Sequence, residues 1–317
     1  DLELQKPAPG EEDLLVRVAA VSVNPVDTKV RMRREPRDEP VVLGWDAVGE
    51  VVGVGPRVTR FRPGDEVWYA GAIDRPGTNA EYHLVDARVA GRAPTSIDAA
   101  AAAALPLTAL TAYEMMFDRL RVQEPVAGGA NALVIIGGAG GVGSVAIQLA
   151  RALTDLRVIA TASRPETQAW VKELGAQHVV NHRAPLAEQI AALGLGAPAF
   201  VFSTNHSGSY SAAVSEFIAP QGRFGLIDDP ESFDVLPLKS KSVSLHWELM
   251  FTRSLYETPD LDRQGQILDE VAGLVDAGRL RSTATEVLGR IDAHHLKQAH
   301  ALIESGTAKG KIVLAGF

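Results

Sequence analysis

Residues 135–143 read Ile-Ile-Gly-Gly-Ala-Gly-Gly-Val-Gly, a glycine-rich turn that follows an apolar run and precedes a segment with helical spacing. Bare backbone at such a turn lets a pyrophosphate approach the N-terminus of the next helix, where unpaired N–H groups and the helix dipole favour an anion. The G-x-G-x-x-G pattern alone is weak, but in this strand–turn–helix context it predicts a dinucleotide site. The expected contacts are Gly138, Gly140, Gly141 and Val142.

Short apolar runs alternate with amphipathic segments on both sides of this turn. Strands are expected at 132–136, 158–160, 179–180, 200–202 and 223–227, and helices at 142–153, 166–174 and 209–218. Regular alternation of strand and helix predicts an α/β fold with a parallel, doubly wound sheet.

The end of the second strand predicts the choice of cofactor. An NAD site carries an Asp or Glu about 20 residues after the glycine turn, where it binds the ribose 2′-hydroxyl. That place falls at Thr161-Ala162-Ser163-Arg164, which contains no acid. Ser163 can donate a hydrogen bond and Arg164 can pair with a 2′-phosphate, which favours NADPH over NADH. The plainer alternative is that Arg164 caps a surface loop.

The segments outside this α/β region differ from it in pattern. The first hundred residues read as short strands and turns, with strands expected at 14–23, 48–54, 66–70 and 79–85. The C-terminal part reads as helices at 264–277 and 293–305, followed by a strand at 311–314. The longest apolar stretch, Ala99 to Phe117, is mostly alanine and contains Pro106, so it predicts buried helices and no membrane span.

Composition excludes several classes of protein. The 317 residues are 46% hydrophobic, and 31 basic against 39 acidic side chains give a net charge of −8, which argues against a nucleic-acid-binding surface. The chain has no cysteine, so disulfides, thiolate zinc sites and a catalytic thiol are excluded. Nothing in the sequence indicates export, and we expect a cytoplasmic protein.

Several motifs occur together in a fixed order: Asn24-Pro25-Val26-Asp27, 43–51, 61–67, 105–113, the glycine turn and 310–314. In these the sequence resembles the medium-chain dehydrogenase/reductases, and within them the quinone oxidoreductase (zeta-crystallin-like) branch, whose relatives are often called zinc-type alcohol dehydrogenase-like proteins. The resemblance implies a Rossmann sheet inserted into a GroES-like β-barrel domain formed by both chain ends. The expected domains are 1–107 plus 253–317, and 108–252.

The resemblance also assigns residues. It implies that Thr111 lies beside the nicotinamide, and that His182 and Lys311 flank the adenosine phosphates. It implies a homodimer formed through the edge of the Rossmann sheet, near 243–247.

Three positions depart from the zinc-dependent members of the family. Those members place Cys, His and Cys where this chain has Asn24, Trp45 and Leu107. Trp and Leu do not bind zinc and Asn is a poor ligand, so we expect no metal. The cysteine-rich lobe that holds structural zinc is replaced by the short loop 71–79.

Without a Lewis acid, simple alcohol oxidation is disfavoured, whereas a quinone or an α,β-unsaturated carbonyl needs less activation to accept hydride. The leading hypothesis is therefore a zinc-independent, NADPH-dependent reductase of such small acceptors. One alternative is an enoyl-thioester reductase, for which the basic run Arg31, Arg33, Arg34 and Arg37 would supply a carrier groove. The other is a non-catalytic NADPH-binding or structural protein.

Five residues are candidates for the substrate site. Asn24 would donate a hydrogen bond to the substrate oxygen or the nicotinamide ribose, with a plain turn residue as the alternative. Lys29 could act as an acid, although the plainer interpretation is that it is a solvated residue on a helix. Trp45, Tyr69 and Phe251 could wall a pocket for a planar acceptor, and core packing explains them about as well.

Overall fold

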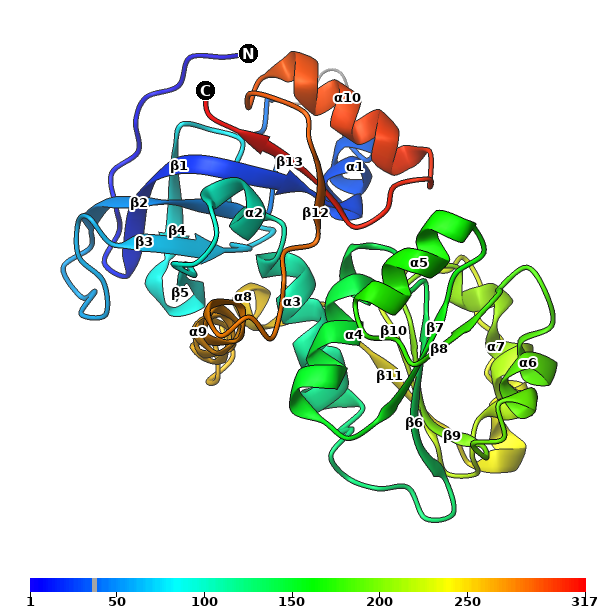
Figure 1. Ribbon diagram of the computed structural model, residues 1–317. Helices are drawn as coiled ribbons and strands as arrows, with labels where there is room; N and C mark the ends of the chain where they lie inside the picture. Colours follow the sequence, from blue (N-terminus) through cyan, green and yellow to red (C-terminus); the bar gives the residue numbers. More distant parts are fainter. Residues whose placement is uncertain (36–38) are drawn as a thin grey trace. The chain divides into compact units, whose positions relative to one another are not determined.

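The computed structural model describes residues 1–35 and 39–317, and the chain forms two compact units (Figure 1). We call them the split unit, Asp1–Leu110 together with Met250–Phe317, and the central unit, Thr111–Leu249. The domain boundaries expected from the sequence lay at 107/108 and 252/253.

The central unit is built on a six-stranded sheet in the order β11-β10-β9-β6-β7-β8. Every pairing in it is parallel. The strands are β6 (Ala130–Ile136), β7 (Arg157–Thr161), β8 (His178–Val180), β9 (Pro198–Ser203), β10 (Arg223–Leu226) and β11 (Ser244–Trp247). The strand order reverses between β6 and β9, which is where doubly wound sheets bind their ligands. The predicted Rossmann-type sheet is confirmed.

Helices cover both faces of this sheet. Figure 1 shows α4 (Gly141–Leu153) and α5 (Pro165–Glu173) on one side, and α6 (Leu186–Ala192) and α7 (Ser211–Phe217) on the other. Alternate strand residues such as Val134 and Val201 pack with Ile190 and Phe217 in one buried apolar cluster. Helix α6 was not expected from the sequence. Three short segments complete the unit: η2 (Glu114–Arg119), η3 (Ser207–Ser209) and η4 (Leu236–Lys241).

The split unit contains a seven-stranded sheet assembled from both ends of the chain. Its order is β12-β13-β1-β2-β3-β5, with β4 paired to β1. The strands are β1 (Asp13–Val23), β2 (Ala47–Val54), β3 (Glu66–Tyr69), β4 (Tyr82–Asp86), β5 (Gly91–Arg92), β12 (Ala284–Val287) and β13 (Lys311–Ala315). Because β13 pairs antiparallel with β1, the last strand of the chain completes the N-terminal sheet.

The helices of the split unit pack around this sheet. They are α1 (Pro25–Met32), η1 (Ala87–Val89), α2 (Ala99–Ala103), α8 (Thr252–Leu255), α9 (Arg263–Asp276) and α10 (Ala293–Glu304), and α3 (Pro106–Tyr113) runs across the boundary at Leu110. Within the described residues, one helical stretch, Ala99–Arg119, is long and apolar enough to cross a membrane by length and composition alone. In its most apolar window 83% of the residues are buried inside the protein, as in a core helix.

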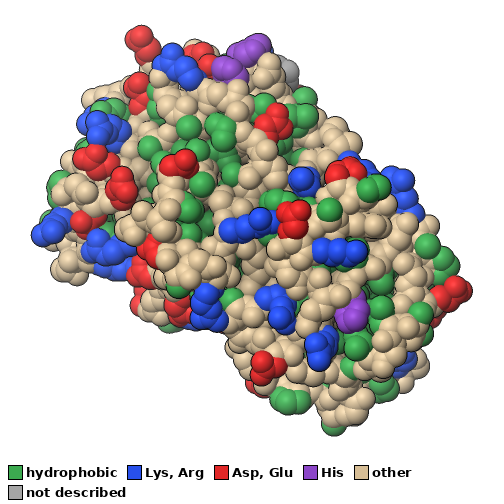
Figure 2. Space-filling model, in the orientation of Figure 1, with side chains coloured by type: hydrophobic (Ala, Val, Ile, Leu, Met, Phe, Trp, Pro, Cys, Tyr) green, Lys and Arg blue, Asp and Glu red, His purple; other side chains and the backbone are tan. Residues whose placement is uncertain are grey.

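Figure 2 shows one face of the molecule, on which both acidic and basic side chains are exposed; several Lys and Arg side chains lie near one another in the lower half of the view.

Candidate functional site

The glycine turn of the central unit is as compact as its sequence requires. Gly137 has φ of 81°, a conformation that L side chains rarely adopt. A Cβ on Gly143 would stand 2.4 Å from the Gly137 carbonyl oxygen, so helix α4 can approach β6 only because residue 143 has no side chain. A Cβ on Gly140 would meet nothing nearer than 3.6 Å. Packing within the protein therefore does not require a glycine at 140.

The loop after β9 lies against this turn. Thr204 donates from both its N–H and its hydroxyl to the Ile136 carbonyl, at 3.1 and 3.0 Å. The turn and the β9 loop thus meet at the point where the strand order reverses. Thr111, expected beside the nicotinamide, is buried on α3.

The predicted cofactor-selecting residues lie between β7 and α5. Arg164 is the N-cap residue of α5, and its N–H donates to the Thr167 hydroxyl at 3.2 Å. The Arg164 side chain is 35% exposed and pairs through Nε with the Glu166 carboxylate at 2.9 Å. Glu166 was not expected from the sequence, although it lies only two residues beyond the segment 161–164.

His182 follows β8 and is half-buried. Burial lowers the pKa of His182, and the charges of Arg183 and His206 lower it further. His206 comes from the loop after β9, where it has φ of 51°. His206 was not predicted from the sequence, although its place just after an expected strand is a signal that could have identified it.

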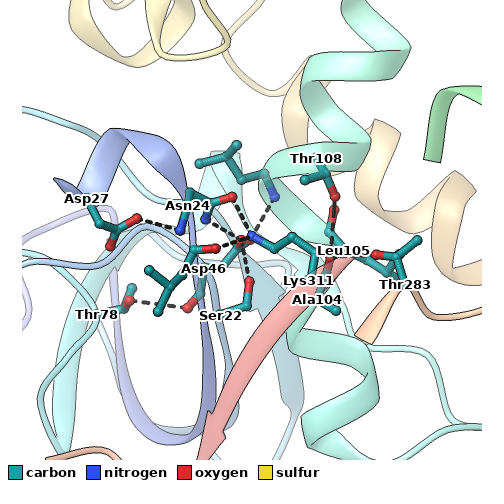
Figure 3. Close-up of polar contacts among 12 residues, drawn as sticks. Ser22, Asn24, Asp27, Asp46, Thr78, Ala104, Leu105, Thr108, Thr283 and Lys311 are labelled. Atoms are coloured by element: carbon teal, nitrogen blue, oxygen red, sulfur yellow. Dashed lines mark hydrogen bonds and ion pairs between the residues drawn. The ribbon is translucent and has the colours of Figure 1, made fainter. Parts of the chain in front are cut away.

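A second group of candidates forms a buried polar cluster in the split unit. Figure 3 shows Lys311 of β13 directed at Asn24 and Asp46. Lys311 Nζ donates to the Val23 carbonyl at 2.8 Å, to Asn24 Oδ1, and to Asp46 Oδ2 at 3.3 Å. The Lys311 and Asp46 side chains are 3% and 0% exposed.

Asp46 organises this cluster, because its carboxylate accepts hydrogen bonds from residues of several elements. Its Oδ2 accepts from the Ser22 hydroxyl and from Asn24 Nδ2, each at 2.7 Å, and its Oδ1 accepts from the Leu107 N–H at 2.7 Å. Asp46 therefore links β1, the start of α1 and the start of α3. Because each bond leaves little freedom, the Asn24 amide is held in one orientation.

Burial dominates the electrostatics of the cluster. It raises the pKa of Asp46 and lowers that of Lys311, and their mutual attraction opposes both shifts. Burial also raises the pKa of Asp27 to about 7, against the lowering effect of the Asn24 N–H and of Lys311. Asp27 Oδ2 accepts from that N–H at 2.9 Å, while Oδ1 is buried without a hydrogen-bond partner.

The side chains at the three zinc-ligand positions do not fit a zinc ion. Asn24 Oδ1 accepts from the Lys311 ammonium, the Leu107 side chain is a hydrocarbon with no donor atom for a metal, and Trp45 Nε1 donates to the Ala72 carbonyl at 3.1 Å. A catalytic zinc needs three protein N, O or S donors in a tetrahedral arrangement, and these three side chains supply no donor that is not already engaged. Among the residues that the structure describes, no group of three or more His, Cys, Asp or Glu is placed to hold a metal.

The three predicted pocket aromatics separate into two places. Trp45 and Phe251 pack edge to face with ring centroids 6.4 Å apart, and both are nearly fully buried. Tyr69 instead stacks on His83, its hydroxyl 3.1 Å from His83 Nδ1. Tyr69 is 0% exposed, because its side chain projects from β3 into the interior of the split unit, and it is therefore a core residue.

Two lysines were also candidates. Lys29 is half-buried on α1. For Lys311 the resemblance implied a place beside the adenosine phosphates. Its ammonium is buried and directed at protein oxygens, so a phosphate could reach it only by displacing a buried carboxylate partner.

Two arginines of the basic run near α1, Arg31 and Arg34, contact other residues. Arg31 pairs with Glu304 and contacts His300 Nδ1 at 3.1 Å, and Arg34 donates to the Glu39 carbonyl. Arg37 lies outside the described residues. These contacts do not favour a carrier-binding groove.

The chain matches two family models: the alcohol dehydrogenase GroES-like domain over residues 10–95, and the zinc-binding dehydrogenase over residues 174–314. It is 40% identical to a zinc-type alcohol dehydrogenase-like protein of Staphylococcus aureus, covering 98% of this chain and 93% of that protein. A Rhizobium etli structure, named as a candidate zinc-dependent alcohol dehydrogenase, is 63% identical with a TM-score of 0.98, covering 100% of this chain and 92% of that one. A mycobacterial protein whose structure was solved with NADPH is 27% identical with a TM-score of 0.78, and the match covers 99% of this chain and 94% of that one.

Fold, glycine turn and relatives together define an NAD(P)-dependent oxidoreductase of two units. The chain belongs to the medium-chain dehydrogenase/reductases, in the family of the zinc-type alcohol dehydrogenase-like proteins. The family name carries the word zinc, whereas the side chains at this chain's ligand positions do not suit that metal.

Proposed function

We propose that this protein transfers hydride from NADPH to a quinone or an α,β-unsaturated carbonyl without a metal. The observation that carries the proposal is that the side chains at the three zinc-ligand positions offer no uncommitted donor to a metal: Trp45 Nε1 donates to a carbonyl, Leu107 is a hydrocarbon, and Asn24 is held by Asp46 and Lys311. An acceptor that is already electron-poor needs orientation more than Lewis-acid activation.

NADPH fits the central unit. The bare backbone of the glycine turn leaves room for a pyrophosphate at the start of α4, and Arg164 with Ser163 would hold the 2′-phosphate. The mycobacterial relative solved with NADPH supports this choice. When bound, the cofactor supplies the hydride.

Asn24 is the residue that we assign to the acceptor. One of its amide hydrogens goes to Asp46 and its oxygen receives one from Lys311. The amide therefore cannot rotate to present its oxygen, and its second N–H is the group that donates to the substrate oxygen or the nicotinamide ribose. Lys311 and Asp46 act through Asn24 as positioning residues.

The test is turnover of NADPH with 9,10-phenanthrenequinone, an enone, an enal and an enoyl thioester, followed by the absorbance of the reduced nicotinamide. We expect oxidation of NADPH with the quinone or the enone, undiminished by a zinc chelator. Asn24→Ala should lower kcat, whereas the exposed Asn131→Ala, a matched control in the other unit, should not. Consumption of NADPH only with the enoyl thioester would support the alternative reductase, and no consumption with any acceptor would support a non-catalytic role.

We also propose a homodimer formed through β11. This strand is one of the two edge strands of the central sheet, so within the described part of the chain no strand of the sheet lies on its outer side. Trp247 and Leu249 at its end are each 52% exposed. Unpaired strand edges with exposed apolar side chains favour association with a second copy.

A further inference from the structure

The acid that an NAD site would place at the end of the second strand is absent, but an acid stands just beyond it. Glu166 is the second residue of α5, and its carboxylate contacts Arg164 Nε at 2.9 Å. The Glu166 side chain is 56% exposed. The residue assigned to the 2′-phosphate is thus already paired with an anion.

The backbone keeps this pair together. Pro165 fixes the first helical position between the two residues, and the Arg164 N–H is bound to the Thr167 hydroxyl. Gln168 Nε2 donates to the Ala162 carbonyl at 3.2 Å, which ties the first turn of α5 back to the end of β7. Both charged side chains therefore project from one fixed turn.

Two consequences follow for a ligand that carries a 2′-phosphate. Glu166 partly neutralises the charge that Arg164 would offer to the phosphate. The phosphate also brings close to two negative charges within a Debye length of the Glu166 carboxylate, and like charges repel. A ribose 2′-hydroxyl suffers no such repulsion.

We propose that Glu166 is a specificity-determining residue that weakens the discrimination of this site between NADPH and NADH by opposing Arg164. The inference rests on the proposed function, because it assumes that the adenosine ribose lies at the end of β7. The inference goes beyond that function, because it assigns to Glu166, which lies outside the segment 161–164, a role in reducing the preference for NADPH.

Glu166→Gln is the variant that tests this, since the amide keeps the size of the side chain and removes its charge. We expect the dissociation constant of NADPH to fall by about 3- to 10-fold, or about 0.7–1.4 kcal/mol, while that of NADH changes less than about 2-fold. The gain should shrink as salt is added, because exposed charges are screened. Glu173→Gln, at the other end of α5, removes the same charge and should change neither constant.

Fragments of the cofactor with and without the 2′-phosphate measure the contribution of that phosphate to binding. Binding of 2′,5′-ADP and of 5′-AMP is measured by calorimetry on wild type and on Glu166→Gln, with thermal unfolding as a check that both are folded. The improvement should occur with 2′,5′-ADP and not with 5′-AMP. When Arg164 is replaced by alanine, Glu166→Gln should improve the affinity for 2′,5′-ADP by a smaller factor, because no Arg164 guanidinium is left for Glu166 to neutralise.

The outcomes separate the two proposals. If wild type binds 2′,5′-ADP no better than 5′-AMP and NADPH no better than NADH, the proposed NADPH function is wrong. If wild type prefers the phosphorylated ligands but Glu166→Gln leaves the ratio unchanged or lowers it, the function stands and the role of Glu166 is refuted.

Discussion

Lys311 and Asp46, 265 residues apart in the chain, form a buried ion pair in the split unit, with Nζ 3.3 Å from Oδ2. The pair joins the last strand, β13, to the residue that precedes β2. It also fixes the amide of Asn24 from both sides, since Lys311 donates to its oxygen and Asp46 accepts from its nitrogen. One interaction therefore serves both the closure of the sheet and the proposed substrate site.

Removal of the buried cation should be costly. Lys311→Met leaves Asp46 buried without its counter-charge, and breaking such a pair typically destabilises a protein by about 3–5 kcal/mol. Urea unfolding measures the change, and the exposed Lys297→Met on α10 is the matched control, expected within about 0.5 kcal/mol of wild type. A loss below about 1 kcal/mol for Lys311→Met would contradict the assigned ion pair.

The stability of the protein should depend on pH through Asp27. Its pKa of about 7 in the folded protein lies above the unfolded value, so the folded state binds more protons between about pH 4 and 7. This contribution is complete below the unfolded pKa and is lost as pH rises through the folded pKa. From about pH 5 to 8, Asp27→Asn should gain about 1–3 kcal/mol relative to wild type. Parallel stability curves for the two proteins would show that Asp27 is ionised throughout.

Two of the five glycines of the turn, Gly140 and Gly143, should behave differently when they are replaced by alanine. Gly143→Ala places a Cβ 2.4 Å from the Gly137 oxygen, and overpacking of this kind typically costs about 1–3 kcal/mol of stability. At Gly140 the nearest atom would be 3.6 Å away, so Gly140→Ala should keep the stability of wild type and lose NADPH affinity instead. Thermal unfolding and cofactor titration of both variants are the measurements. Tight NADPH binding by a folded Gly140→Ala would show that the cofactor does not approach this backbone.

The proposed dimer gives a prediction about Trp247. A lysine at this exposed edge position places a charge where a second copy would pack, so Trp247→Lys should be monomeric by light scattering. Tyr256→Lys is the control, because Tyr256 is 76% exposed but belongs to the split unit. An unchanged mass for Trp247→Lys, with a dimeric wild type, would place the interface elsewhere.

The central unit could be predicted well because its signals are local. The glycine turn and the alternating apolar runs depend on neighbours a few residues apart, and the parallel sheet follows from them. Short elements were missed, as at β5 with its two residues, because so few residues carry no periodicity. Glu166 was missed for a different reason: the search for an acid ended at Arg164, although both side chains project from the same turn.

By itself, the sequence determined which chemistry is available: no cysteine, no ligating side chains at the three zinc positions, and a turn that leaves room for a pyrophosphate. These are properties of residue type and short spacing. Only the tertiary structure decided where Lys311 directs its charge, that Tyr69 lies in the core, and that Asp27 is buried deeply enough to raise its pKa. Each of these depends on contacts between segments distant in the chain. Lys311 reaches Asp46 because β13 pairs with β1, and Tyr69 is buried where β3 pairs with β2 and its ring stacks on His83.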